Sequence, residues 1–170
     1  MPSRRCAEEA GSVRIVIDTN VVASAVFFGG RPGELLDLLL HRRLEAVATD
    51  RIVAEYQATV DYLLARYGEG QMRLSLLPVV AAMDLIPQTE DIHICRDPDD
   101  DKFISCAVDG GCIYIVSGDK DLLSVGQYDG VEILTVAQFL EQYHARLKAR
   151  HDDIDGQSQG GLDMPRSRIP

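Results

Sequence analysis

Short apolar runs alternate along this chain with longer segments that repeat apolar residues at helical spacing. Most of the runs are rich in valine and isoleucine, and continuous runs of this kind are typical of strands buried on both faces of a parallel sheet. The predicted strands are residues 13–17, 46–48, 85–86, 113–116 and 131–134. The predicted helices are residues 21–28, 32–40, 51–67, 72–82, 97–109, 119–125 and 135–147. This alternation predicts an α/β fold with three layers, α/β/α, around a mostly parallel central sheet.

The domain organisation follows from the same pattern. Residues 13–147 are predicted to form one domain, preceded by an N-terminal tail, residues 1–12, and followed by a C-terminal tail, residues 148–170. Glycine, serine and glutamine are frequent in the C-terminal tail, which has little to bury and is predicted to be disordered. At the helix ends, Pro32 suits a first turn, while Asp50 and Thr135 are predicted caps.

The composition indicates a cytoplasmic protein. No apolar run reaches the roughly 18 residues that a membrane span needs. The first ten residues carry acids and lack the apolar stretch of a secretory signal. The four cysteines contain no Cys-x-x-Cys pair, which favours free thiols in a reducing compartment over a disulfide or a zinc site.

Acidic residues stand at several points where a predicted strand ends or a predicted helix begins. Asp18 follows the first strand, Glu55 lies one turn into a helix, and the run 97–101 opens another helix. Asp119 and Asp121 follow a later strand. Strand ends of a parallel sheet converge at one edge, where such folds place their sites. Because converging carboxylates repel one another, this arrangement predicts a divalent cation with oxygen ligands, Mg²⁺ or Mn²⁺.

Each acidic position also has a simpler interpretation when it is taken alone. Asp18 could serve only as a helix cap, Glu55 as a solvated helix residue, and the run 97–101 as a charged loop. The run also matches the start of an EF-hand loop, but the sixth position is Lys102 instead of glycine and the twelfth is Val108 instead of glutamate. Only the joint placement of these acids favours a metal site.

Other phosphate chemistries fit the sequence less well. A phosphotransferase of the haloacid dehalogenase type needs Asp-x-Asp, and Asn20 occupies the second position. A two-component receiver would use Asp18 and Asp50, but it needs an acidic pair near the start of the chain that is missing here. The four histidines have no metal-ligand spacing.

The net charge of −10 argues against tight nucleic-acid binding without metal. Residues 13–143 hold 21 acidic and 10 basic residues, and eight of those acids belong to the candidate site. A bound divalent ion would reverse the local field. The charge is therefore compatible with a metal-dependent nuclease.

Taken together, these motifs resemble the PIN domain family, and in particular its bacterial branch of VapC-like toxin ribonucleases. The resemblance rests on Ile-Asp-Thr-Asn-Val-Val, on Glu55, on Asp-Pro-Asp-Asp-Asp-Lys-Phe-Ile and on Val-Ser-Gly-Asp-Lys-Asp-Leu-Leu, in this order. It covers about residues 13–143. The resemblance implies a PIN-like fold and a metal-dependent endoribonuclease that cleaves single-stranded RNA.

The resemblance also implies an acidic quartet, with four further residues in support. The catalytic residues would be Asp18, Glu55, Asp101 and Asp119, and the metal ligands would be Asp18, Asp101 and Asp119. Asp101 is preferred because the third acid of the family stands three residues before an apolar helix position, here Ile104, although the neighbouring aspartates leave this choice open. The supporting residues would be Asn20, Asp99, Ser117 and Asp121.

The expected partners follow from the same resemblance. A small antitoxin is expected to cover the acidic site, and residues 21–28 and 35–40 could supply its groove, although burial in the core explains them equally well. Homodimerisation is also expected, and a membrane is not. The alternative function is a catalytically silent PIN-like module that binds RNA or protein.

Overall fold

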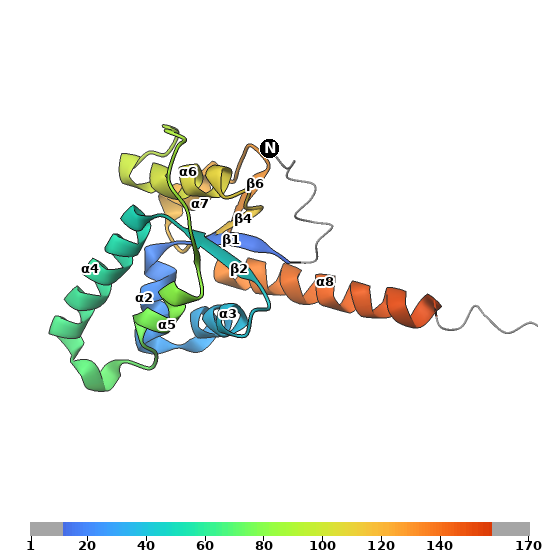
Figure 1. Ribbon diagram of the computed structural model, residues 1–170, viewed down its shortest axis with the longest axis horizontal. Coiled ribbons are helices and arrows are strands. Elements are labelled where there is room, and N and C mark those ends of the chain that lie inside the picture. The colour runs from blue at the N-terminus through green and yellow to red at the C-terminus, as the bar shows by residue number, and fades with distance from the viewer. Residues whose placement is uncertain (1–11, 158–170) are drawn as a thin grey trace, which may run out of the picture.

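The computed structural model describes residues 12–157, with side chains described to residue 151, and shows an α/β fold around one six-stranded sheet (Figure 1). The strands follow the order β3-β2-β1-β4-β6-β5. They are β1 (Arg14–Ile17), β2 (Glu45–Ala48), β3 (Asp84–Leu85), β4 (Tyr114–Val116), β5 (Gln127–Tyr128) and β6 (Val131–Leu134). All neighbouring pairs are parallel except β5 with β6. The mostly parallel sheet predicted from the sequence is therefore confirmed.

The sheet centre is formed by β1 and β4, whose side chains are almost completely buried. Ile15 pairs with Tyr114 and Ile17 with Val116, so the two strands end level with each other. Strands buried on both faces must be apolar throughout, which is why the sequence shows continuous runs here instead of alternation. The residues that follow these two strands consequently lie side by side at the carboxyl edge of the sheet.

Helices cover both faces of the sheet. The helices are α2 (Thr19–Phe28), α3 (Gly30–Leu40), α4 (Asp50–Tyr67), α5 (Leu76–Ala81), α6 (Asp101–Asp109), α7 (Lys120–Val125) and α8 (Val136–Gln157), with short 3₁₀ turns η1 (Glu69–Gln71) and η2 (Pro98–Asp100). Helix α6 packs across β1, β2, β4 and β6 on one face, and α2, α3, α5 and α8 group on the other (Figure 1). The predicted three-layer architecture is thus observed.

Several predicted boundaries differ from the structure for local reasons. Thr49 caps α4 in place of Asp50, because the Thr49 side chain accepts a hydrogen bond from the Ile52 amide at 3.4 Å. The helix predicted over 72–82 shrinks to α5, and the antiparallel edge strand β5 was not predicted. Thr135 begins the last helix as predicted, since its Oγ1 accepts from the Gln138 amide at 3.2 Å.

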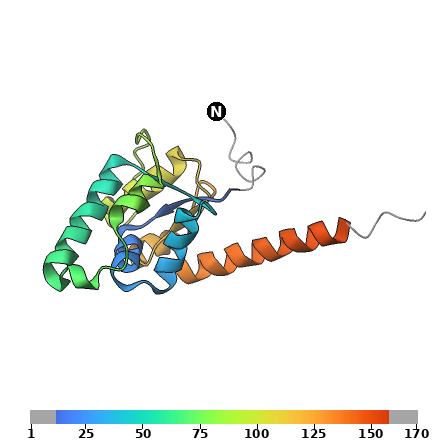
Figure 2. The ribbon, with the colours of Figure 1, turned by 60° about the horizontal axis from the view of Figure 1, so that its bottom comes forward.

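The last helix is longer than predicted. Helix α8 continues to Gln157 and runs out beyond the sheet, as both views show (Figures 1 and 2). The helix end predicted at about residue 147 is therefore ten residues too early. Residues 158–170, and the N-terminal residues 1–11, lie outside the described part of the chain.

The apolar residues of α2 and α3 belong to the core. Val22, Val26, Leu35 and Leu36 are completely buried. Burial in this chain's own core therefore accounts for most of the apolar residues in the two segments, and the groove for a partner stays a prediction. Phe28, 61% exposed, is the clear exception.

Two further expectations concern membranes and cysteines. Within the described residues, no helix is long and apolar enough to cross a membrane. Cys95, Cys106 and Cys112 are free thiols, and the latter two are buried. Cys6 lies outside the described residues.

Candidate active site

The carboxyl ends of β1 and β4 bring Asp18 and Asp119 to the same place. The Asp18 amide donates to the Val116 carbonyl at 2.9 Å, which continues the ladder one residue past β1. The Ser117 hydroxyl donates to Asp18 Oδ2 at 2.7 Å, and the Asp119 amide donates to the Ser117 oxygen at 2.9 Å. Ser117, completely buried, thus links the two aspartates.

Asp119 also caps the helix that follows it. Its Oδ1 accepts from the amides of Asp121, at 2.7 Å, and Leu122, at 3.3 Å, at the start of α7. Asp18 makes no such side-chain cap to α2, although it precedes that helix. The cap interpretation therefore accounts for part of the role of Asp119 but does not account for the burial of Asp18.

Glu55 reaches this edge from the second turn of α4. Its Oε1 accepts a hydrogen bond from the Thr19 hydroxyl at 2.6 Å, next to Asp18, and its Oε2 forms an ion pair with the Lys102 ammonium. The Tyr56 hydroxyl donates to the Ile17 carbonyl, so α4 is fixed to the end of β1. Glu55 is consequently held in the site by Thr19, the first residue of α2, and by Lys102 of α6.

The acidic run 97–101 forms a turn in which each aspartate has a different environment. Asp97 caps η2 by accepting from the Asp99 amide at 3.0 Å. Asp99 is exposed and pairs with Arg51 at 3.1 Å. Asp97 therefore serves the turn, and Asp99 stays at the surface.

Asp101 is buried, but the backbone of the preceding loop holds its carboxylate. Oδ1 accepts from the Ile94 amide at 3.0 Å and from the Cys95 amide at 2.7 Å, and Oδ2 lies 3.8 Å from His93 Nδ1. Burial acts to raise the pKa of Asp101, yet these hydrogen bonds outweigh it and lower the pKa below its usual value. Asp101 thus anchors the loop before η2.

Among the aspartates of the run 97–101, Asp100 is the one whose pKa is raised by the charges of Asp18 and Asp119. Burial, followed by the negative charges of Asp119, Asp97 and Asp18, raises its pKa to about 6. No such effect of Asp18 or Asp119 on Asp101 is among the causes of its lowered pKa. The charges of Asp18 and Asp119 thus act on Asp100, while Asp101, the third acid predicted from the sequence, is bonded to the backbone of the preceding loop.

The pKa of Asp18 is also raised by burial and by a neighbouring carboxylate. It is only 4% exposed. Burial raises the pKa of Asp18, the Ser117 hydrogen bond opposes this, and the charge of Asp119 raises it further. Raised pKa values and mutual repulsion are the properties expected of carboxylates that together bind a cation.

The donor set fits a hard divalent cation, although the ligands are not pre-assembled. Among the described residues, no three acidic, histidine or cysteine side chains are close enough to enclose an ion as they stand. Asp18, Asp100 and Asp119 would offer oxygen ligands only, which suits Mg²⁺ or Mn²⁺. A carboxylate has two oxygens with about four lone-pair sites, so the hydrogen bonds from Ser117 and the α7 amides leave capacity for an ion.

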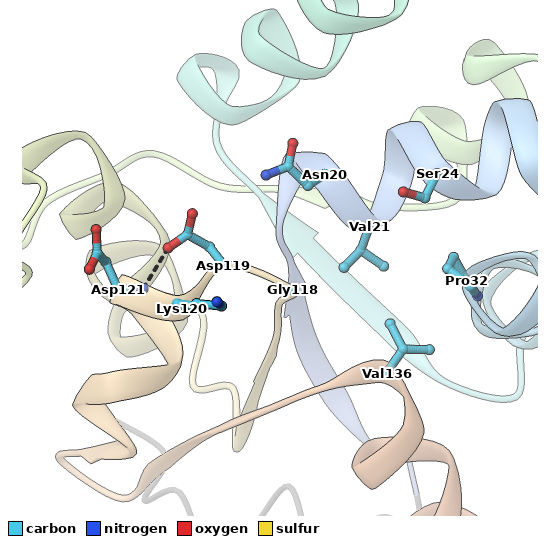
Figure 3. A pocket seen from close by; sticks show the side chains of 9 residues that line it. All are labelled: Asn20, Val21, Ser24, Pro32, Gly118, Asp119, Lys120, Asp121 and Val136. Carbon is cyan, nitrogen blue, oxygen red and sulfur yellow. Dashed lines mark hydrogen bonds between the residues drawn. The ribbon is translucent and has the colours of Figure 1, made fainter.

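A pocket of about 650 Å³ opens beside this cluster, between the start of α2 and the start of α7 (Figure 3). Asn20, exposed at the beginning of α2, and Asp121 line it together with Asp119. The Lys120 side chain points into the pocket (Figure 3). The pocket is therefore lined both by the carboxylates of Asp119 and Asp121 and by the ammonium group of Lys120.

Of the predicted supporting residues, Ser117 contacts the quartet most directly, and Asn20 and Asp121 line the pocket. Asp99 lies outside it. The sequence analysis missed Lys102, which is only 5% exposed and whose ammonium also donates to the Asp99 carbonyl at 2.6 Å. A lysine directly after a run of acids looks like a solvated charge, and only the fold shows that it turns inward.

Comparison with known proteins identifies the family of this chain. Residues 14–121 match the family model described as PIN domain. A protein of Methanocaldococcus jannaschii named uncharacterized protein MJ1680 is 34% identical over 118 residues, which cover 66% of this chain and 75% of that protein. The solved structure of the T. brucei RRP44 PIN domain aligns over 91% of this chain and 95% of its own, with 13% identity and a TM-score of 0.45. Because the family model spans more than half of the sequence, this chain belongs to the PIN domain family.

Proposed function

We propose that this protein is a divalent-metal-dependent endoribonuclease that cleaves single-stranded RNA. PIN domains are typically nucleases and generally use divalent metal ions. The observation that carries the proposal is the position of Asp18 and Asp119 at one sheet edge, where Ser117 links them. Their charges also help to raise the pKa of Asp100 to about 6. A cation among these carboxylates would remove their mutual repulsion.

The residues at this edge divide into ligands and positioning groups. Asp18, Asp100 and Asp119 would hold Mg²⁺ or Mn²⁺, which would activate a water molecule and neutralise charge on the scissile phosphate. Ser117 keeps Asp18 oriented through its hydrogen bond. Glu55, held by Thr19 and Lys102, accepts or orients the proton of the attacking water.

The basic residues beside the acids are the candidates for binding the RNA substrate. Lys120 points into the pocket, where its ammonium group reaches a phosphate of an RNA strand (Figure 3). Arg51 and Arg96, both largely exposed, stand next to Asp99 and Asp121 and can exchange these partners for phosphates. Salt bridges at the surface are weak, so this exchange costs little.

The proposal is tested by incubating a panel of single-stranded RNAs with the protein and Mn²⁺ or Mg²⁺. The wild type is expected to cleave within the strand, and excess chelator is expected to stop it. The Asp119→Asn variant keeps an oxygen that can accept from the α7 amides, and it should lose nearly all activity. Asp61→Asn, an exposed acid on α4 far from the sheet edge, is the matched control and should remain fully active. Cleavage that persists in chelator would overturn the proposal, and a complete lack of cleavage would favour the silent binding module.

The toxin role is a narrower proposal that rests on the resemblance to VapC-like ribonucleases. A small antitoxin needs an apolar surface to bind, and Phe28 and Tyr67 form an exposed aromatic pair with ring centroids 6.3 Å apart. Co-expression with the product of the neighbouring small open reading frame is expected to give a complex that loses RNA cleavage. Free cleavage activity in the presence of that product would contradict the toxin role without affecting the nuclease proposal.

A further inference from the structure

The pocket beside the acidic cluster has a second side that the proposed cleavage reaction does not use. Its volume of about 650 Å³ lies within the range of about 300–1,000 Å³ that is usual for small-molecule sites. Asp119, Asp121 and Lys120 line one side of it, and an apolar side lies opposite (Figure 3). The pocket therefore has more room than a metal ion and a phosphate need.

Three apolar side chains form this second side, and each comes from the first turn of a different helix. Val21 belongs to the first turn of α2, Pro32 to that of α3, and Val136 is the first residue of α8. Pro32 and Val136 are only half-buried. Apolar surface that faces a pocket favours ligands with apolar faces, because binding removes both surfaces from water. The flat faces of a nucleobase meet this requirement.

Asn20 and Ser24 add hydrogen-bonding groups to the same pocket. They stand four residues apart on α2, and residues at this spacing lie on the same face of a helix. Within the described part of the chain, neither side chain has a hydrogen-bonding partner. An amide and a hydroxyl can each donate and accept. Together they can pair with the edge of a nucleobase whose face lies against the apolar side.

The place of the pocket beside the acids suits one nucleotide of an RNA strand. Asp119, one of the proposed metal ligands, lines it. Each base of RNA is joined to its phosphate through a single ribose, so a phosphate bound at the metal brings a neighbouring base to this pocket. Lys120 points into the same space, where its ammonium group is placed to contact that phosphate (Figure 3).

We propose that this pocket binds the nucleobase next to the scissile phosphate and that Ser24 determines which bases are accepted. The inference rests on the proposed ribonuclease function, whose acids hold the phosphate at the edge of the same pocket. The acids then supply the reaction, and the pocket supplies the preference among RNA sequences. Ser24 separates the two roles in an experiment, because Asn20 stands closer to the acids in the chain.

The test measures binding of AMP, GMP, CMP and UMP to the full chain by isothermal titration calorimetry in the presence of Mg²⁺. Ribose 5-phosphate, which has the same phosphate and sugar but no base, is the reference ligand. At least one nucleotide is expected to bind about tenfold more tightly than the reference, because only a nucleotide buries a base against the apolar side.

Two variants of Ser24 assign this difference to the pocket. Ser24→Ala keeps a good helix former and removes only the hydroxyl, so it should weaken the preferred nucleotide about 3–10-fold and leave ribose 5-phosphate unchanged. Ser24→Leu places a bulky side chain in the pocket and should abolish the advantage of every nucleotide over the reference. Ser75→Ala, an exposed serine that does not line the pocket, is the matched control and should bind all ligands as the wild type does. Equal melting temperatures check that the variants fold.

The outcomes separate this proposal from the ribonuclease function. If no nucleotide binds more tightly than ribose 5-phosphate, or if Ser24→Leu leaves their advantage intact, the pocket does not bind bases, whether or not the protein cleaves RNA. If nucleotides bind as expected and no RNA is cleaved, base binding is supported and the ribonuclease function fails. If RNA is cleaved with a preference for one base beside the cut, Ser24→Ala should reduce that preference in kcat/KM about 3–10-fold. A preference that Ser24→Ala leaves unchanged would overturn the role of Ser24.

Discussion

Replacing Asp100 by asparagine is expected to stabilise the protein at neutral pH when no metal is present. Burial and the charges of Asp119, Asp97 and Asp18 raise the pKa of Asp100 from 3.8 to about 6. The folded protein therefore binds this proton more tightly than the unfolded chain does, so stability falls as the pH rises from 3.8 through about 6. Above that range the loss is complete, and asparagine removes it.

The magnitude follows from the shift. A change from 3.8 to about 6 corresponds to about 3 kcal/mol at about 1.4 kcal/mol per unit. Because the Asp100 side chain is partly exposed, screening by solvent reduces this to about 1–2 kcal/mol. For a chain of this length, that is a rise in melting temperature of about 2–8 °C at pH 7, and almost none below pH 4.

Asp101→Asn is the matched control, one residue away and expected to act in the opposite direction. The lowered pKa of Asp101 means that its carboxylate stabilises the fold above the unfolded value of 3.8, and this stabilisation is lost as pH falls through the lower folded value. Losing the charge that the Ile94 and Cys95 amides hold should cost about 1–2 kcal/mol at pH 7.

Both variants are compared by thermal unfolding in chelator and in Mn²⁺ at several pH values. Asp100→Asn should also lose the extra stabilisation that Mn²⁺ gives the wild type, whereas Asp101→Asn should retain it. The reasoning is refuted if Asp100→Asn destabilises the metal-free protein at pH 7 or if Asp101→Asn is the variant that no longer responds to Mn²⁺.

Three other predictions concern separate parts of the molecule. Lys102→Met removes the cation that holds Glu55 and is expected to lower kcat about 10–100-fold with little change in KM. Lys102→Arg should recover part of the lost kcat. Equal kcat values for the wild type and Lys102→Met in steady-state kinetics would contradict this role. Removing residues 151–170 should leave the melting temperature and RNA cleavage near wild type, because the buried residues Phe139, Leu140 and Tyr143 of α8 precede the cut. A large fall in the melting temperature, measured by calorimetry, would contradict this prediction. Burial raises the pKa of the Cys106 thiol to about 12, so Cys106 should resist iodoacetamide in the native protein and react on unfolding, as mass spectrometry can show.

The sequence predicted the sheet and the meeting of its acids because both depend on local patterns. Continuous apolar strands such as 13–17 and 113–116 must be buried on both faces, and the residue after each strand must lie at the carboxyl edge. Asp18 follows directly from that rule, and Asp119 stands three residues past the end of 113–116, in the turn at the same edge. Their convergence needed no knowledge of side-chain contacts.

The choice among the aspartates of 97–101 could not be made in the same way. It depends on the amides of Ile94 and Cys95, which come from a loop without periodicity and take up the Asp101 carboxylate. The 3₁₀ turn η2 then sets the direction of Asp100, and sequence alone does not distinguish such a turn from the first turn of a helix. The inward position of Lys102 was missed for the same reason, because its partner Glu55 is 47 residues away in the chain.

The cap at Thr49 and the length of α8 show two further limits. Thr49 and Asp50 are both good capping residues, and only the observed bond to the Ile52 amide decides between them. Helix α8 continues through a largely charged segment, so the apolar pattern that predicted its end at 147 had no signal beyond that point.

A crystal structure of the protein grown with Mn²⁺, with anomalous diffraction measured at the manganese edge, tests the central claim most directly. The account predicts an anomalous peak bounded by the carboxylates of Asp18, Asp100 and Asp119, with oxygen ligands at about 2.0–2.2 Å and Asp101 still bonded to the Ile94 and Cys95 amides. A peak that contacts Asp101 in place of Asp100, or no peak at this edge at saturating Mn²⁺, would contradict it.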